Sequence, residues 1–321
     1  MTIRRDLVGE VVAALDAGTN TLRLLVVEQD ADGRLVELDR QLRFVGLGQG
    51  VDATRRFSDE AVQRAWAAVD EYVPVLRRLG ARRARFVATS ASRDASNRDE
   101  FFDGVARRLG VVPELISGDE EAALSFTGAL AGARIDGEPV LVMDSGGGST
   151  ELVRGSASGV IDGAESLDVG SRRIRERYLL SDPPEPGQIA EARAEVGRLL
   201  DGLGVDLGGI TTFVGVAGTV TTMAALNLGL TSYDRSLVHG SSMSVDEVVA
   251  LAERLLAMSV DEVIALGPVQ PERAKVLCAG ALVVAEVVER VGVELQASES
   301  DILDGIALSM LRDGKGQVLP G

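Results

Sequence analysis

Cysteine and histidine are almost missing from this chain of 321 residues, which contains one of each, Cys278 and His239. A single cysteine excludes a disulfide within the chain and is typical of the reducing cytosol, so we expect a cytoplasmic protein. Zinc sites are usually built from several cysteine and histidine ligands, and this composition therefore disfavours a zinc enzyme.

Basic residues, aromatic residues and long apolar runs are also scarce. Lysine and arginine number 33 against 49 acidic residues, the formal net charge is −16, and aromatic residues make up 3%. Nucleic-acid binding needs a basic footprint and often stacking aromatics, so we expect no nucleic-acid partner. An acidic protein can still bind an anion through local devices, namely metal ions, backbone N–H groups and a few arginines.

No apolar run approaches the roughly 18 residues that span a bilayer. The N-terminal segment MTIRRDLVGEVVAALDAG is interpreted as leading into a first strand and not as a signal peptide, because acidic residues surround its short apolar run. We therefore expect no membrane partner.

The residues that are present alternate between apolar strands and amphipathic helices, and the length suggests about two domains. In the first part we predict strands over 11–17, 22–28, 33–45, 85–89 and 113–117, and helices over 59–79, 94–109 and 119–132. The order then begins again, with strands over 139–144, 150–154, 158–167 and 212–216, and helices over 171–180, 187–203, 245–257, 271–292 and 301–313.

A repeated motif accompanies this repeated order. Asp16-Ala-Gly-Thr-Asn-Thr and Asp144-Ser-Gly-Gly-Gly-Ser both follow an apolar strand and precede a second strand. The repeat predicts two similarly built α/β lobes that face each other across a cleft. Each lobe would offer a carboxylate at a strand end and a turn rich in backbone donors.

Such motifs suit phosphoryl transfer, which depends on positioning and on neutralising charge. Asp16 and Asp144 are candidate Mg²⁺ ligands, with Glu151 as a second carboxylate. Gly146, Gly147 and Gly148 allow a phosphate to approach the backbone, and Ser149 and Thr150 add hydroxyl groups. A single motif of this type could equally be an ordinary glycine-rich hairpin, but its repetition favours the functional interpretation.

Three further segments each allow two interpretations from the residues alone. The loop around Gly218 and Thr219 is either an anion-binding helix start or an ordinary strand–helix turn. Glu121 is either a general base or one of several acidic residues at a helix N-terminus, and the second interpretation is preferred at this point. Arg93 either grips phosphate or pairs with Asp94.

The basic run Arg172, Arg173, Arg175 and Arg177 also has two interpretations. A solvated helix face is the usual case for such a run. The alternative is a patch that binds the distal part of a polyanion.

Taken together, the motifs resemble the exopolyphosphatase / guanosine pentaphosphate phosphohydrolase (Ppx/GppA) family, in its short two-domain form. The matching segments are ALDAGTNTLRLLV (14–26), ATSASRDASN (88–97), ISGDEEAAL (116–124), LVMDSGGGSTELV (141–153), SLDVGSRRI (166–174), VGVAGTVTTMAAL (214–226) and PERAKVLCAGA (271–281). The resemblance implies the actin / sugar-kinase / Hsp70 fold, with duplicated, ribonuclease H-like α/β lobes and an interdomain cleft. We expect lobes over 1–125 and 126–321, the last helix returning to the first lobe.

The resemblance also implies roles for individual residues. Glu121 would be the catalytic base, Asp144 and Glu151 would hold Mg²⁺ (or Mn²⁺) with help from Asp16, and Arg93 would bind substrate phosphate. The implied phosphate-loop residues are Thr19, Asn20, Gly146, Gly147, Gly148, Ser149, Gly218 and Thr219, with Arg23 and Arg273 for distal phosphates.

The implied activity is Mg²⁺-dependent hydrolysis of the terminal phosphate of inorganic polyphosphate, with a preference for short chains because a helical C-terminal domain of many family members is not found here. Guanosine pentaphosphate is the alternative substrate, which would link the protein to the stringent response. A kinase or polymer-forming ATPase of the same superfamily, and a non-catalytic sensor of polyphosphate or nucleotide, are less favoured. A homodimer is also expected.

Overall fold

The structure, a computed structural model, describes residues 9–30 and 35–320. Residues 33 and 34 of the predicted third strand and the first eight residues lie outside this part. The chain divides into two compact units, one built from residues up to Ser117 together with those from Ile302 onward, the other from Gly118–Asp301. The division thus falls before residue 125, and the last helix belongs to the first unit.

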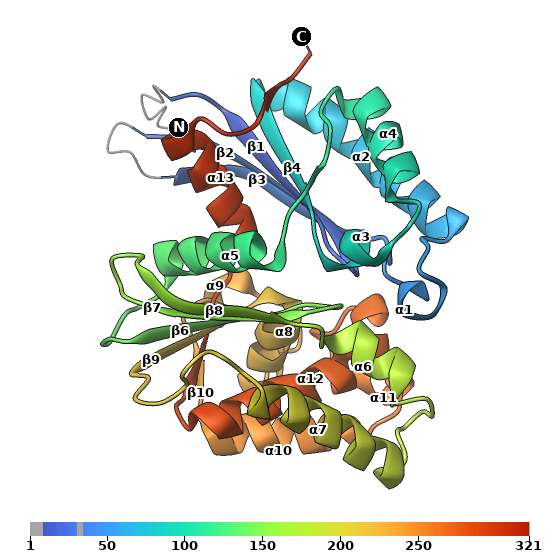
Figure 1. The fold of residues 1–321 in the computed structure, drawn as a ribbon, viewed down its shortest axis with the longest axis vertical. Coiled ribbons are helices and arrows are strands. Elements are labelled where there is room, and N and C mark those ends of the chain that lie inside the picture. The colour runs from blue at the N-terminus through green and yellow to red at the C-terminus, as the bar shows by residue number, and fades with distance from the viewer. Residues whose placement is uncertain (1–8, 31–34, 321) are drawn as a thin grey trace. The chain divides into compact units, whose positions relative to one another are not determined.

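The first unit contains one sheet and five helices among its described residues (Figure 1). Its strands are β1 Val12–Ala17, β2 Thr21–Gln29, β3 Leu35–Phe44, β4 Arg83–Ala88, β5 Glu114–Leu115 and β12 Gln317–Val318. Its helices are α1 Val51–Thr54, α2 Asp59–Leu79, α3 Ser90–Asp94, α4 Arg98–Leu109 and α13 Ile302–Asp313.

The second unit contains a second sheet and more helices. Its strands are β6 Val140–Ser145, β7 Thr150–Gly155, β8 Ile161–Leu167, β9 Thr212–Val216, β10 Ser242–Met243 and β11 Leu295–Ala297. Its helices are α5 Gly118–Gly132, α6 Ser171–Arg177, α7 Pro186–Asp201, α8 Ala217–Asn227, α9 Arg235–Val238, α10 Val245–Leu256, α11 Val260–Ile264 and α12 Pro271–Val291.

The two sheets have the same strand order. The first runs β12-β4-β1-β2-β3, with β5 also paired to β4, and the second runs β10-β11-β9-β6-β7-β8. In each sheet the first three strands are antiparallel neighbours, and the next strand pairs in parallel with the first of them. The predicted α/β class with a duplicated lobe is therefore confirmed.

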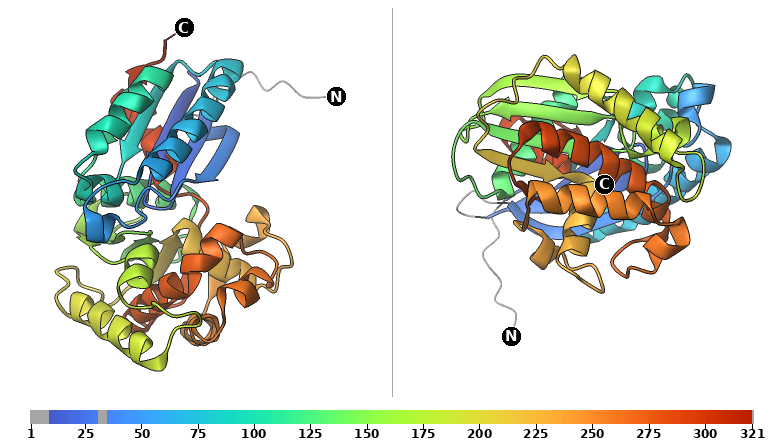
Figure 2. Two further views of the ribbon diagram at one scale, coloured as in Figure 1. Left: turned by 90° about the vertical axis from the view of Figure 1, so that its right-hand side faces the viewer. Right: turned by 90° about the horizontal axis from the view of Figure 1, so that it is seen from below.

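Both sheets are covered on both faces, which explains why their inner strands are almost continuously apolar. In the first unit α2 and α4 lie side by side over one face, and α13 packs against β1 and β2 (Figure 2). In the second unit α5 covers one face, while α12 lies between α7 and α10 below the other. Each sheet is thus covered on one face by a helix that follows the other sheet's strands in sequence.

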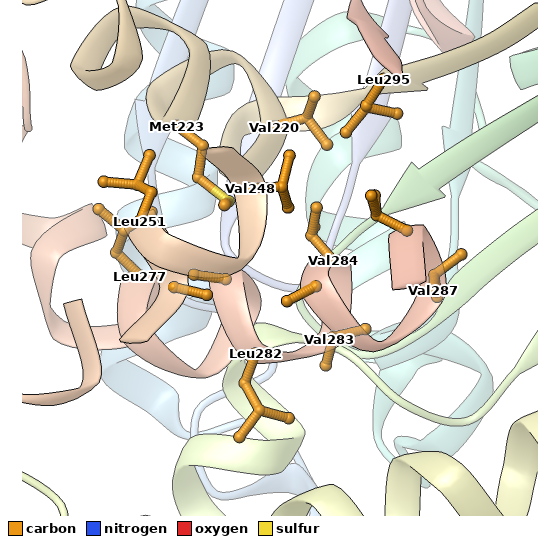
Figure 3. Packing of buried hydrophobic residues seen from close by; sticks show 14 of the residues in the cluster. Val220, Met223, Val248, Leu251, Leu277, Leu282, Val283, Val284, Val287 and Leu295 are labelled. Atoms are coloured by element: carbon orange, nitrogen blue, oxygen red, sulfur yellow. The ribbon is translucent and has the colours of Figure 1, made fainter. Parts of the chain in front are cut away.

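The largest core surrounds α12. Side chains of α8, α10 and β11, including Val220, Leu251 and Leu295, pack around Leu277 and Val284 of this helix (Figure 3). This core holds the start of α8 in place, where one of the candidate loops lies. No helix among the described residues is long and apolar enough to cross a membrane.

Most of the predicted elements match, and the mismatches have local causes. Helix α2 covers the predicted range 59–79, because the Ser58 side chain caps its start and Gly80 ends it with a positive φ of 72°. The predicted helix 94–109 is wrong at its start, since α3 ends at Asp94 and α4 begins at Arg98. The Asn97 side chain bonds both the N–H and the C=O of Phe57, which holds the chain in a break between the helices.

Candidate active site

Two opposed carboxylates mark the centre of the second unit. The antiparallel register of β6 and β7 places Asp144 directly opposite Glu151, so their side chains leave the same face of the sheet. Both side chains are buried, with relative exposures of 7% for Asp144 and 1% for Glu151. This face is the one that α5 covers, through contacts with Val140 and Val142.

Helix α5 brings a third carboxylate and a hydroxyl group to the pair. Glu121 is 8% exposed, and Ser125 follows it by one helical turn on the same side of the helix. The Ser125 hydroxyl donates to Asp144 Oδ2 at 2.5 Å. On the other side, the Ser166 hydroxyl of β8 donates to Glu151 Oε1 at 2.7 Å. Each strand carboxylate is therefore oriented by a serine.

The three carboxylates interact electrostatically. Burial raises the pKa of Glu151 well above its usual value, and the nearby charges of Glu121 and Asp144 raise this pKa further, while hydrogen bonds from Ser166 and Ser149 lower it. Because the unfavourable contributions are the larger ones, the cluster has excess negative charge. A bound cation would relieve this repulsion.

The donor set fits Mg²⁺ or Mn²⁺ better than zinc. Within residues 9–30 and 35–320 no group of three or more acidic, histidine or cysteine side chains is arranged to hold a metal ion by itself. Mg²⁺ does not require such a cage, since it usually keeps several waters and binds one or two carboxylates together with substrate phosphate. The opposed oxygen ligands of Asp144 and Glu151 suit that mode of binding.

The glycine turn connects these two strands. It is closed by a hydrogen bond from Gly146 N–H to Ser149 O at 3.0 Å. In the first unit Gly18 N–H donates to Thr21 O, also at 3.0 Å, so the two repeated motifs form the same turn. The repeat detected in the sequence is thus a repeat of backbone geometry.

The first unit differs from the second in charge. Arg23 stands opposite Asp16 in the register of β1 and β2, at the position that Glu151 occupies in the second unit. The Arg23 Nε and Nη2 atoms donate to Asp16 Oδ2 at 2.9 and 2.7 Å. The Asp16 carboxylate therefore already has a protein cation beside it.

The loop after β9 reaches the same end of the second sheet as the glycine turn, because Asp144 pairs with Val216 in the parallel register. Helix α8 begins there without a side-chain cap, which leaves its first N–H groups for a ligand. A Cβ on Gly218 would lie 2.0 Å from Arg273 Nη1, so the guanidinium of Arg273 rests on this loop. The structure thus brings Gly218, Thr219 and Arg273 together.

In the first unit Arg93 lies at the end of α3, next to the strand end where the other loop of that unit begins. Its Nη1 donates to Ile116 O at 3.3 Å, while Asp94 pairs with Arg55 at 2.8 Å. The hydroxyl groups of Ser90 and Ser92 are buried without a hydrogen-bond partner in the described structure. Thr19 and Asn20 occupy the turn between β1 and β2.

The candidate residues therefore form two sets. One set lies in the second unit and consists of Glu121, Asp144, Gly146, Gly147, Gly148, Ser149, Glu151, Gly218, Thr219 and Arg273. The other lies in the first unit and consists of Asp16, Thr19, Asn20, Arg23 and Arg93. The predicted cleft that would join the two sets stays a prediction.

Three contributors were missed at the level of the sequence, namely Ser125, Ser166 and Arg173. Ser125 had a usable signal, because its spacing of four from Glu121 places both on one side of a helix. Ser166 and Arg173 contact residues that are distant in sequence, and no local pattern indicates them.

The comparisons with known proteins agree with these motifs. The model of the Ppx/GppA phosphatase family matches residues 25–312. The protein named exopolyphosphatase 2 from Mycobacterium tuberculosis is 43% identical over 314 residues, which are 93% of this chain and 98% of the relative.

Solved structures show the same relationship. An exopolyphosphatase-like protein with 43% identity superposes with a TM-score of 0.90 and covers 94% of this chain and 97% of its own. A Ppx/GppA family member from Aquifex aeolicus has 26% identity and a TM-score of 0.80, over 96% of this chain and 99% of its own.

Proposed function

Because this chain belongs to the Ppx/GppA phosphatase family, we propose that it is an exopolyphosphatase. It hydrolyses the terminal phosphoanhydride bond of inorganic polyphosphate with the help of Mg²⁺ and releases orthophosphate. The observation that carries this proposal is the position of Glu121, a buried carboxylate whose charge acts on the Asp144–Glu151 pair. A base and a cation site are thus close together in one unit.

In the proposed mechanism Glu121 accepts a proton from a water molecule, and the water oxygen attacks the terminal phosphorus atom. A P–O bond forms, and the P–O bond to the bridging oxygen breaks, so that the shortened chain leaves with the electron pair. Asp144 and Glu151 would hold Mg²⁺, which neutralises charge on the phosphate oxygens. Mn²⁺ is the alternative ion.

The remaining residues position the substrate. The N–H groups of the turn at Gly147, Gly148 and Ser149 and those at the start of α8 stabilise charge on phosphate oxygens. Arg273 and Arg93 supply positive charge to phosphates. Since Asp16 is already paired with Arg23, we assign Asp16 the role of holding that arginine and give the metal to the second unit.

The test is release of orthophosphate from tripolyphosphate, long-chain polyphosphate and guanosine pentaphosphate, measured side by side without metal, with Mg²⁺ and with Mn²⁺. We expect metal-dependent release from polyphosphate and a higher kcat/KM for the short chain. Hydrolysis of guanosine pentaphosphate alone would replace the proposed substrate. Binding of all three without any hydrolysis would indicate a sensor.

Two further calls belong to this proposal. The single buried thiol of Cys278 suits a reducing compartment, so we place the activity in the cytoplasm. A homodimer is tested by sedimentation velocity of the purified chain, with a mass of one chain as the contradicting result.

A further inference from the structure

The side of the glycine turn that faces α6 is held by the start of this helix. Ser171 N–H donates to Gly146 O at 3.0 Å, and the N–H groups of Arg172 and Arg173 donate to Gly147 O at 2.9 and 3.1 Å. The next carbonyl, Gly148 O, accepts a hydrogen bond from Arg173 Nε at 2.8 Å. Three successive carbonyl groups of the turn therefore point toward α6.

This arrangement determines where the N–H groups of the turn point. The peptide bonds of the turn are trans, so the N–H of each peptide points away from its C=O. The carbonyl groups of Gly146, Gly147 and Gly148 share their peptides with the N–H groups of Gly147, Gly148 and Ser149. These three N–H groups are consequently directed away from α6, where they can meet an anion.

Close packing makes the contact possible. A Cβ on Gly170 would lie 2.6 Å from the carbonyl carbon of Gly147 and 2.8 Å from Gly148 N, and backbone atoms cannot yield as a flexible side chain can. Gly170 thus allows the start of α6 to approach the turn. Arg173 itself is only 7% exposed, so its guanidinium is fixed at the turn and does not extend into solvent.

The first unit contains the same support without an arginine. There the segment after β3 supplies the donors: Gly48 N–H bonds Thr19 O at 2.8 Å, and the N–H groups of Val45 and Gly46 bond Asn20 O at 3.0 and 2.9 Å. Since β1–β2 and β6–β7 form equivalent turns, Asn20 corresponds to Gly148. In the second unit, a guanidinium takes the place of two backbone amides.

The other arginines of the basic run have different partners. Arg172 pairs with Glu176 at 3.2 Å, and Arg175 bonds the carbonyl groups of Leu179 and Ser181 at the far end of α6. Arg173 alone among these three contacts the glycine turn. The run is therefore not one continuous patch with one role.

We propose that Arg173 is a positioning residue for phosphate binding, because it holds the Gly148 carbonyl and so aims the Ser149 N–H at the substrate. The charge of the guanidinium also polarises the peptide between them, which strengthens the N–H as a donor. This inference rests on the proposed function, since it concerns how that site binds phosphate.

The first test is an amide NMR titration with orthophosphate and tripolyphosphate, with and without Mg²⁺, on the full chain. We expect the amide signals of Gly147, Gly148 and Ser149 to shift in the wild-type protein and to respond much less in Arg173→Gln. The matched control is Arg175→Gln, which removes a carbonyl-binding arginine from the same helix but not from the turn. Unchanged shifts in Arg173→Gln, or no response of these amides in the wild type, would overturn the proposal.

The second test separates positioning from stability. We expect Arg173→Gln to lose about 10- to 100-fold in kcat/KM for tripolyphosphate, as misplacement of a binding group usually does, while Arg175→Gln stays within about threefold of wild type by the same reasoning. Arg173→Lys, which keeps the charge but lacks the Nε donor, should lose activity in the same direction and serves if the glutamine variant does not fold. Equal losses in the Arg173 and Arg175 variants would reduce Arg173 to a structural role.

The amide titration also distinguishes this inference from the proposed function. If wild-type protein releases no orthophosphate from polyphosphate, the function is wrong, yet the turn amides still report whether Arg173 directs anion binding.

Discussion

Glu151 stands directly opposite Asp144 across β6 and β7, whereas the equivalent position opposite Asp16 holds Arg23. The two units therefore share a turn but not its charge. An acidic pair in the second unit repels itself and favours a cation, as the raised pKa of Glu151 reflects. The ion pair in the first unit is already neutral. This difference is the reason for assigning the metal to one unit only.

The role of Glu121 is tested by Glu121→Gln. We expect turnover to fall about 10²- to 10⁴-fold, since a general base is lost, while tripolyphosphate binding measured by calorimetry is retained. Glu120→Gln on the same helix is the control and should leave turnover close to wild type. If Glu121→Gln keeps near-normal turnover, another group is the base.

The raised pKa of Glu151 predicts how stability depends on pH. With a folded-state pKa above the usual 4.5, ionisation of Glu151 costs stability, and this loss develops as the pH rises above that value. Without metal, Glu151→Gln should therefore melt at a higher temperature than wild type at pH 7, and the difference should vanish below about pH 4, where the carboxyl group is protonated in both states.

Mg²⁺ should reverse this order. We expect the ion to raise the melting temperature of the wild type more than that of Glu151→Gln, because binding to the native state stabilises it by mass action. The exposed variant Glu191→Gln is the control and should respond to Mg²⁺ as the wild type does. Equal stabilisation of Glu151→Gln and wild type would remove Glu151 from the metal site.

The hydrogen bond between Ser125 and Asp144 is tested by Ser125→Ala. A ligand that loses its orienting partner typically loses about 10- to 100-fold in metal affinity, so the Mg²⁺ concentration for half-maximal activity should rise by that order. Thr127→Ala removes a hydroxyl that bonds only the Ala123 carbonyl of the same helix, and its Mg²⁺ requirement should not change. An unchanged requirement in Ser125→Ala would contradict the role of this serine.

The contact between Gly218 and Arg273 is tested by Gly218→Ala. The new Cβ would lie 2.0 to 2.2 Å from three guanidinium atoms, and this flexible side chain can move, so we expect KM for tripolyphosphate to rise with little change in melting temperature. Gly197→Ala, where nothing lies within 4 Å, should leave KM unchanged and stabilise α7 slightly. A normal KM in Gly218→Ala would mean that Arg273 does not bind substrate from this position.

Local signals predicted much of the fold. Helix α2 could be delimited because Ser58, the apolar spacing and Gly80 all act within a few residues of its ends. The strand–turn–strand motifs were recognisable because turn chemistry and strand hydrophobicity are also local. By contrast β11, a buried strand of three residues, was missed because its pairing partner β9 is about 80 positions away in the sequence.

The sequence by itself determined the repeated turns, the supply of carboxylates at their strand ends and the membership of the chain in its family, because these depend on residue type and short spacing. Only the tertiary structure decided that α5 carries Glu121 to the second sheet, that Arg23 neutralises Asp16, and that Arg173 turns inward to Gly148. Each of these outcomes depends on strand register or on which surfaces pack together. Those are properties of contacts between distant parts of the chain, and no local pattern encodes them.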